Sequence, residues 1–288
     1  MLLQVLFSGL AVGSIYGLVA LGFAVVFKAT DVFNFAQGMF VVCGAFFAVT
    51  ATSILKLPFP IAMVFMIGAA ALMGVVIHVL LIQKLSGRSM LSVIMLTIAL
   101  SILIRALIEM IYGLQSRNLV TPLPTGVFLI GDLRISQLHL TAALTSWACM
   151  AGFGVFFRYT SVGLLMRATA DGHEAALVSG INVNVMNRLA WAIGAVLAAI
   201  GGLFLGQLQI VSPELETIGL LALPAVVIGG MQSIPGAIVG GIIVGLIEQL
   251  ASVYVSPKSS DILIYTLLLL ILMFRPWGLF GQKELGRV

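Results

Sequence analysis

The sequence predicts an all-α polytopic membrane protein that forms a single transmembrane domain over residues 1–288. Of these residues 61% are hydrophobic and only 8% are charged, and the mean hydropathy is +1.21. Soluble domains carry about 25% charged residues, so this composition indicates a chain that lives in lipid. Its apolar runs are continuous and do not alternate with polar residues, which favours spanning helices over the strands of a barrel.

Nine apolar segments are candidates to cross the bilayer, which takes roughly 20 residues in a helix. They are residues 5–27, 38–55, 61–82, 90–112, 138–157, 189–210, 218–228, 236–254 and 262–274. The seventh is short and interrupted by Pro224, and the ninth reaches span length only if it extends back through Ser259 and Ser260. We therefore expect eight or nine membrane helices, counting interrupted or re-entrant ones. No basic region of the kind that opens a cleaved signal precedes the first run, so we expect it to be a span.

The distribution of the 14 basic residues predicts an orientation. If the polar segment around Arg167 is cytoplasmic and the spans alternate, the inside set is larger than the outside set, and Arg105 lies within a span. The inside set is Lys28, Lys84, Arg88, Arg158, Arg167, Arg188, Arg275, Lys283 and Arg287, and the outside set is Lys56, Arg117, Arg134 and Lys258. Because basic residues favour the cytoplasmic side, we expect the N-terminus outside and the C-terminus inside. The basic residues form no cluster, so the pI of about 9.3 does not indicate a nucleic-acid partner.

Two polar breaks interrupt the apolar pattern, at residues 31–38 and 223–236. Hydrophobic segments interrupted by Gly and Pro early and late in a chain are typical of transporters built from two inverted repeats. No residue-level repeat accompanies these breaks, and two ordinary short loops at the membrane face are the alternative interpretation. The candidates for a translocation pathway are the polar and small residues of the breaks and one intramembrane carboxylate: Asn34, Gln37, Gly38, Gly229, Gly230, Gln232, Ser233, Pro235 and Glu248.

Small residues recur every four positions in three spans. The sets are Gly9, Gly13 and Gly17; Ala198, Gly202 and Gly206; and Gly236 and Gly240 with Gly241 and Gly245. Such stripes let helix backbones approach closely, which predicts tight packing within the chain. A dimer interface or a pore-lining stripe is the alternative.

Residues 163–182 form the one long polar interruption, and we expect a cytoplasmic loop over residues 158–188. Asp171 with Glu174 three positions later is close to a capping box, which predicts a helix that begins at Asp171. The helix formers Ala175 and Ala176 follow, and Gly180 occupies the position of a terminating C′ glycine. A capped helix outside the bilayer is a docking surface for another protein.

The sequence contains no pattern for covalent catalysis. It has no Gly-Lys dipeptide, so a Walker A loop cannot be built, and no Gly-x-Ser-x-Gly elbow. Its three histidines lack metal-ligand spacing. Cys43 and Cys149 fall in apolar segments and are interpreted as small buried hydrophobes. If ATP drives transport, the ATPase must be a separate chain.

Few charges lie within the predicted spans. Arg105 and Glu109 are four positions apart on one helix, which predicts that they pair. Glu248 has no cation nearby in sequence; it lines the pathway, pairs with another helix or lies near the outer interface. Carriers coupled to protons or sodium usually need acidic residues in their spans, so one unpaired carboxylate gives that alternative little support.

Three motifs carry a family resemblance across nearly the whole chain. Glu174, Ala175, Ala176 and Gly180 match the Glu-Ala-Ala-x-x-x-Gly signature of ABC-importer permeases. The segment 34–38, Asn-Phe-Ala-Gln-Gly, resembles the Asn-Phe-Ala-(His/Gln)-Gly motif of LivH-like branched-chain amino acid importer permeases. Residues 227–241 are similar to that group's late Gly-Gly-Met-x-Ser-x-Pro-Gly motif, and the ending at residues 274–281 also fits.

The resemblance implies a bacterial inner-membrane permease, not an enzyme, paired with a second, similar permease. Two cytoplasmic ATPase subunits that use ATP and Mg²⁺ drive the pair, and a periplasmic binding protein delivers the substrate. The chain itself would bind no cofactor. The resemblance assigns ATPase coupling to Arg167, Asp171, Glu174, Ala175, Ala176 and Gly180.

The resemblance leaves the substrate open. Branched-chain or other hydrophobic amino acids suit an apolar pathway, but the family also contains importers of urea, short amides and aromatic acids. Two alternative functions lie outside this family: an ion-coupled carrier, and a channel or structural membrane subunit.

Overall fold

The structure is a computed structural model that describes residues 2–85, 88–130, 133–257 and 259–281. Within these ranges seven helical segments are long and apolar enough to cross a membrane. They are α1 (Leu2–Thr30), α2 with the π-helical turn η1 (Gln37–Val49 and Thr50–Ile54), α3 with η2 and η3 (Phe59–Ile77, His78–Ile82 and Gln83–Leu85), α4 (Met90–Tyr112), α5 (Gln137–Tyr159), α8 (Val183–Leu208) and α11 (Ile234–Tyr254). The predicted all-α polytopic membrane fold is confirmed.

Two shorter apolar stretches add to the seven long helices, so the described residues contain nine candidate membrane segments, where eight or nine were expected. The first consists of α9 (Leu215–Leu220) and α10 (Ala222–Gly229), which are separated at Leu221. Pro224 has no N–H to donate to the carbonyl four residues earlier, at Leu220, so the helix is interrupted where the sequence predicted. The second is α12 (Ser259–Phe274), which begins at the serine that the sequence required.

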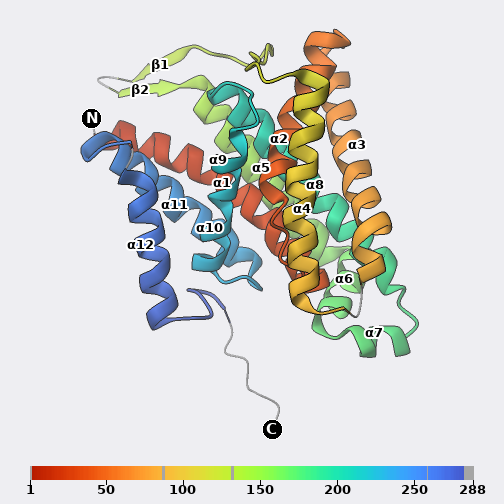
Figure 1. The fold of residues 1–288 in the computed structure, drawn as a ribbon. Coiled ribbons are helices and arrows are strands. Elements are labelled where there is room, and N and C mark those ends of the chain that lie inside the picture. The colour runs from red at the N-terminus through yellow and green to blue at the C-terminus, as the bar shows by residue number, and fades with distance from the viewer. Residues whose placement is uncertain (1, 86–87, 131–132, 258, 282–288) are drawn as a thin grey trace.

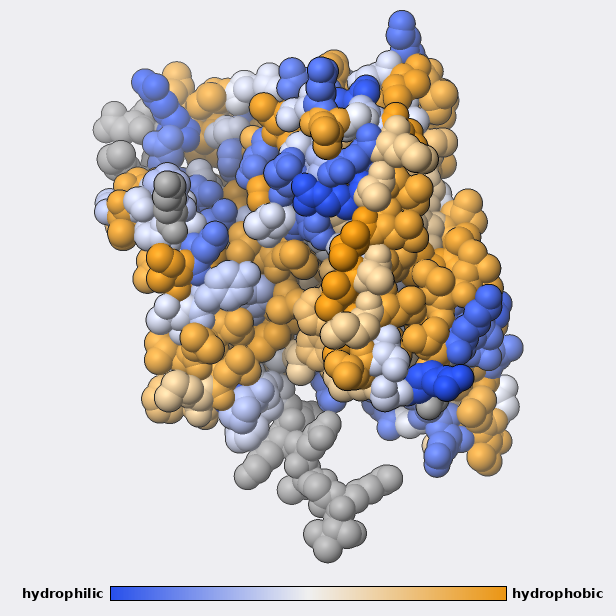
Figure 2. Space-filling view, in the orientation of Figure 1, coloured by the Kyte–Doolittle hydropathy of each residue, from blue (hydrophilic) through white to orange (hydrophobic). Residues whose placement is uncertain are grey.

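The surface has the pattern of a membrane protein. Figure 2 shows a broad apolar area over α3 and α4, with hydrophilic residues gathered toward the two ends of the bundle. Large apolar side chains are exposed on these two helices, among them Val64 at 71% and Ile102 at 66%. Because water would penalise such surface, we assign this band to the hydrocarbon core of the bilayer.

The segment between α4 and α5 contains a β-hairpin, which is not helical. Strands β1 (Val127–Ile130) and β2 (Leu133–Ser136) pair antiparallel, with Val127 opposite Ser136. The sequence analysis did not predict these strands. They lie between α4 and α5 at one end of the bundle, where water can solvate their edges, so they do not alter the helical membrane core (Figure 1).

Helix α1 is the centre of the bundle, and its most apolar stretch is 94% buried. Its glycine stripe lies against α11: a Cβ on Gly245 would come within 2.3 Å of the backbone of Gly13. Likewise, a Cβ on Gly202 of α8 would lie 2.0 Å from the carbonyl oxygen of Val41 in α2. The prediction that these stripes pack within the chain is confirmed.

The two ends of the bundle carry different elements. Leu2 and the β-hairpin lie at one end, whereas α6 (Ser161–Asp171), α7 (His173–Val178) and the end of α12 at Phe274 lie at the other (Figure 1). The first helix therefore starts on the side opposite to the polar segment, as the alternating pattern required. Lys258, Lys283 and Arg287 of the orientation argument lie outside the described residues.

Candidate functional site

The polar segment 158–188 forms two helices, α6 and α7, rather than one. The side chain of Thr160 caps α6 by accepting a hydrogen bond from the N–H of Gly163, at 3.0 Å. Asp171 is the last residue of α6, and Gly172 is the N-cap of α7. The prediction that Asp171 caps the second helix is therefore wrong. Gly172 takes up the extended conformation that separates the helices, so Asp171 stays helical and cannot adopt the N-cap geometry.

The C-terminal end of α7 follows the prediction. Gly180 has a φ of +79°, the left-handed conformation that favours glycine. Its N–H donates to the carbonyl of Leu177, and the N–H of Ile181 donates to that of Ala176, each at 3.0 Å. This pair of bonds is a Schellman motif. Asn182 then caps α8 by accepting from the N–H of Val185 at 3.2 Å, so α7 connects to α8 through two defined caps.

One face of α7 is open. Ala176 is buried against the bundle, while Glu174 and Ala175 are exposed. Two apolar side chains beside them are more exposed still, Leu177 at 60% and Val178 at 91%. Because α7 lies at the end of the bundle, beyond the long spans α3 and α4, we assign this apolar surface to a protein contact and not to lipid (Figure 1).

Helix α6 is fastened to the end of α5. The guanidinium of Arg167 donates a hydrogen bond to the carbonyl of Phe157, and its central carbon lies 5.5 Å from the centre of the Phe157 ring. A Cβ on Gly163 would lie 2.5 Å from the carbonyl oxygen of Phe156, so only glycine allows this approach. Arg167 thus holds the polar segment to a span instead of extending freely.

The structure brings two groups of predicted site residues together. A polar cleft of about 910 Å³ opens at the α6 end of the bundle. Arg167 and Asp171 line it from α6, and the late break lines it with Gln232, Ser233 and Pro235. Lys28, Asp31 and Arg158 add further charges to its wall. Such a cleft can hold a polar or zwitterionic molecule at the mouth of a membrane pathway.

Gly229 and Gly230 have a different role in the late break. The N–H of Leu279 donates to the carbonyl of Ile228 at 2.9 Å, and that of Phe280 to Gly229 at 3.0 Å. Gly230 has a φ of +107°, and a Cβ on it would lie 2.6 Å from the N of Gly281. These two glycines therefore join the break to the chain after α12 and do not line the cleft.

The early break begins at the exposed Asp31 in the wall of the cleft and continues into the bundle at Asn34 and Gln37. The amide of Gln37 donates to the carbonyl of Gly194 at 3.3 Å, and it accepts from Asn34 at 3.0 Å. Gly194 is eleven residues into α8, which places this turn about 16 Å from the start of that helix. Asn34 and Gln37 are 1% and 2% exposed. Their amides satisfy each other and nearby backbone groups, and whether they also face the pathway stays a prediction.

Gly38 lets the early break approach α9 closely. A Cβ on Gly38 would lie 2.8 Å from the carbonyl oxygen of Glu216, at the start of α9. The early interruption is therefore in direct backbone contact with α9, the helix that precedes the late interruption, which spacing in the sequence did not reveal.

The charged group near the hairpin end is larger than the sequence suggested. Arg105 and Glu109 pair at 2.9 Å, as predicted. Arg105 also reaches Glu214 at 3.2 Å and Glu216 at 3.6 Å, and Ser101 donates a hydrogen bond to Glu216. The acidic pair Glu214 and Glu216 at the start of α9 was the available signal, but its partner Arg105 lies more than a hundred residues earlier in the chain.

Glu248 of α11 faces α1. It hydrogen-bonds to the Tyr16 hydroxyl, and its Oε2 has no partner among the described residues. Among the alternatives, this contact corresponds to pairing with another helix. Within the described ranges, no group of three or more His, Cys, Asp or Glu side chains is placed to hold a metal ion.

These features define a class: a polytopic membrane protein with broken helices, a polar cleft at one end and an exposed helical loop beside it. Residues 5–272 match the family described as branched-chain amino acid transport system, permease component. The chain belongs to this family.

Three curated relatives cover nearly its whole length. It is 29% identical to the high-affinity branched-chain amino acid transport system permease protein LivH of Salmonella typhimurium, over 99% of this chain and 97% of that protein. It is 30% identical to the permease protein BraD of Pseudomonas aeruginosa, over 99% and 98%. It is 24% identical to a probable LivH of Methanocaldococcus jannaschii, over 94% and 90%. Its relatives are permease subunits and not enzymes.

Proposed function

We propose that the chain is the permease subunit of an ATP-driven importer for branched-chain or other hydrophobic amino acids. The single observation that carries the proposal is the exposed α7 face at the end of a family permease bundle. Leu177 and Val178 present apolar side chains to water on a helix held by caps at its C-terminal end. That surface needs a protein partner, and a cytoplasmic ATPase is the partner that an importer of this family would use.

The mechanism follows from how the polar segment is attached. Arg167 and Gly163 hold α6 to α5, and the Schellman turn with Asn182 leads α7 directly into α8. A movement of the ATPase against Glu174, Ala175 and the apolar face would therefore be transmitted to both α5 and α8. Asp171 and Arg167 also line the cleft, so the same movement would change the shape of its mouth.

The cleft is the proposed cytoplasmic mouth of the pathway. Gln232, Ser233 and Pro235 supply its wall from the late break, and the charges of Arg167 and Asp171 suit the two ends of a zwitterionic amino acid. In this proposal the α6 end faces the cytoplasm of a bacterial inner membrane, with the N-terminus outside. The remaining partners are a second permease, two ATPase subunits that bind ATP and Mg²⁺, and a periplasmic binding protein.

The test is reconstitution of the complex in liposomes, with ATPase copurification and labelled leucine uptake as readouts. L177D/V178D should lose both, because two carboxylates would be buried without partners at the ATPase contact. V120D is the matched control, since Val120 is 72% exposed in the segment between α4 and β1, at the hairpin end. Uptake that survives ATP depletion, or a double variant that still copurifies the ATPase and transports normally, would overturn the assignment. Competition by valine, urea and benzoate would identify the substrate class.

A further inference from the structure

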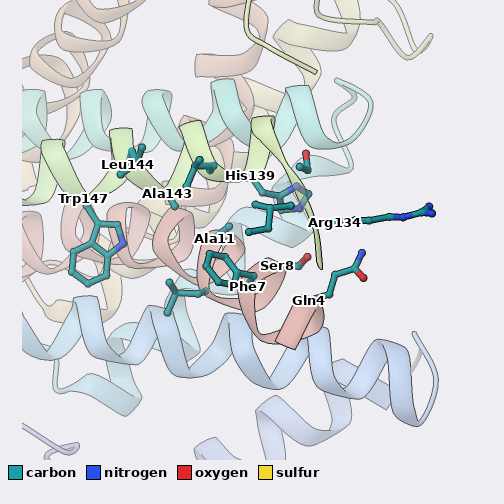
Figure 3. Close-up of a pocket in the computed structure, with 13 residues that line it drawn as sticks. Gln4, Phe7, Ser8, Ala11, Arg134, His139, Ala143, Leu144 and Trp147 are labelled. Carbon is teal, nitrogen blue, oxygen red and sulfur yellow. The ribbon is translucent and has the colours of Figure 1, made fainter. Parts of the chain in front are cut away.

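We propose that the groove between α1 and α5 holds an anionic phospholipid of the leaflet on the N-terminal side of the membrane. This groove of about 240 Å³ is lined by the start of α1, by β2 and by α5 (Figure 3), and the β-hairpin lies at the end of the bundle opposite to α6 and its cleft (Figure 1). Three features of the groove indicate the leaflet and the charge of the headgroup. One end is polar, the stretch along α5 is apolar, and the far end is closed at Trp147.

The two ends of the groove differ in chemistry. Figure 3 shows Gln4, Ser8 and His139 at one end, where the Arg134 side chain extends outward, while Leu144 and Trp147 lie at the other. An amphiphile fits this division, with its polar group at the hairpin end and its chain along α5. A fully apolar or fully polar ligand would leave one end of the groove unmatched.

The charge at the mouth selects an anion. Arg134 is exposed and forms no ion pair among the described residues, and no acidic side chain lines the groove. It stands three positions before α5 begins at Gln137, which is the level of lipid headgroups. A phosphate there would gain a cation and the amide of Gln4 as a donor.

The length of the groove matches one leaflet. Trp147 follows Gln137 by ten residues, which corresponds to about 15 Å along the helix. The hydrocarbon core of a bilayer is about 30 Å thick, so the groove ends near the midplane. There the indole N–H of Trp147 donates to the Ser14 hydroxyl at 2.8 Å and joins α5 to α1.

Small residues create the hollow, and this closed end favours a lipid over a protein partner. Ser8 and Ala11 on α1 face Ala143 on α5, and larger side chains would fill the space between them. A partner helix would continue through both leaflets, whereas an acyl chain ends where the groove ends. Trp147 and Leu144, 46% and 61% exposed, leave one side of the groove open to the bilayer.

The experiment is native mass spectrometry of the purified permease titrated with phosphatidylglycerol or with phosphatidylcholine. The wild-type protein should retain one phosphatidylglycerol more firmly than phosphatidylcholine. R134A should weaken that retention about fivefold, as expected for one basic residue near an anionic headgroup, and R134K should restore most of it. A143L should weaken the binding of both lipids, because it fills the hollow.

The controls are matched by residue type. K56A removes another exposed cation, from the segment between α2 and α3 at the hairpin end, and A148L enlarges an exposed alanine of α5 that does not line the groove. Both should retain the lipid as the wild type does. Equal retention by R134A and the wild type would overturn the proposal, as would no preference for the anionic lipid. A disulfide between L144C and a cysteine of the partner permease would also overturn it, because protein would then cover the groove.

Discussion

Arg167 of α6 makes two contacts with Phe157 of α5. Its guanidinium donates a hydrogen bond to the Phe157 carbonyl, and the central carbon of the guanidinium lies 5.5 Å from the centre of the Phe157 ring. A hydrogen bond to a charged donor is worth about 1.5–3 kcal/mol, and a cation–π contact adds about 0.5–1 kcal/mol at an exposed site. The pair therefore attaches the polar segment to a span through two contacts of one α6 side chain.

We expect R167A to separate ATP hydrolysis from transport. The ATPase would still dock on α7, but α6 would no longer move with α5, so leucine uptake per ATP should fall several-fold. R167K should recover only part, because an ammonium does not reproduce the planar contact with the ring. Faster hydrogen exchange in α6 of R167A would support this reason, and an unchanged uptake-to-ATP ratio would contradict it.

The contact between Gly13 and Gly245 predicts a large stability effect from one methyl group. In G245A the new Cβ would lie 2.3 Å from the backbone of Gly13, so α1 and α11 would have to move apart. Overpacking of this kind costs about 1–3 kcal/mol, which should lower the apparent melting temperature in detergent. G152A is the matched control, because nothing lies within 4 Å of a Cβ there. It should leave stability unchanged or slightly raised. Equal behaviour of the two variants would contradict the packing.

The buried amide pair predicts that Gln37 acts on stability rather than on substrate affinity. Q37L would leave the side-chain N–H group of the buried Asn34 amide without its acceptor and remove a second hydrogen bond from the Gly194 carbonyl, at a cost of about 1–3 kcal/mol. The KM for uptake should not change in the protein that remains folded. Q232L alters an exposed glutamine of the cleft and should show the opposite result, with normal stability and altered uptake. A changed KM with normal stability in Q37L would return Gln37 to the pathway.

The acidic group before α9 predicts a pH dependence. Hydrogen bonds from its own backbone N–H and from the Ser212 hydroxyl, with Arg105 nearby, hold the pKa of Glu214 below its ordinary value of 4.5. A lowered pKa in the folded state means a contribution that is present above the unfolded pKa and lost as the pH falls through the folded one. E214Q should therefore be less stable than the wild type at pH 7, and the difference should begin to shrink as the pH falls below 4.5 and disappear below the folded-state pKa.

Salt provides the check on that prediction. The side chain of Glu214 is 71% exposed, so the difference should be small and should shrink further at high ionic strength. Thermal unfolding at pH 7 and pH 4, with and without 1 M salt, measures it. E174Q is the control, an exposed carboxylate with no ion pair among the described residues. A difference that persists at acid pH would contradict the assignment.

The predictions that the structure confirms rest on local chemistry. Gly180 ends α7 because a left-handed residue is needed there, and the helix of residues 218–228 breaks because Pro224 lacks a donor. The N-cap prediction for Asp171 failed for a local reason as well, since Gly172 offered a better place for the break. The β-hairpin was missed because its strands are short and follow no buried pattern.

By itself the sequence determined the membrane class, the position of the spans, the polar segment and the family, because run length, composition and turn residues act along the chain. Only the tertiary structure decided which faces meet. It placed Arg105 beside Glu214, Gly13 against Gly245, and Arg167 with Gln232 at one cleft. It also showed that Asn34 and Gln37 serve the interior of the bundle. Helical periodicity gives each residue a face, but the partner of that face is chosen by close packing between helices far apart in sequence.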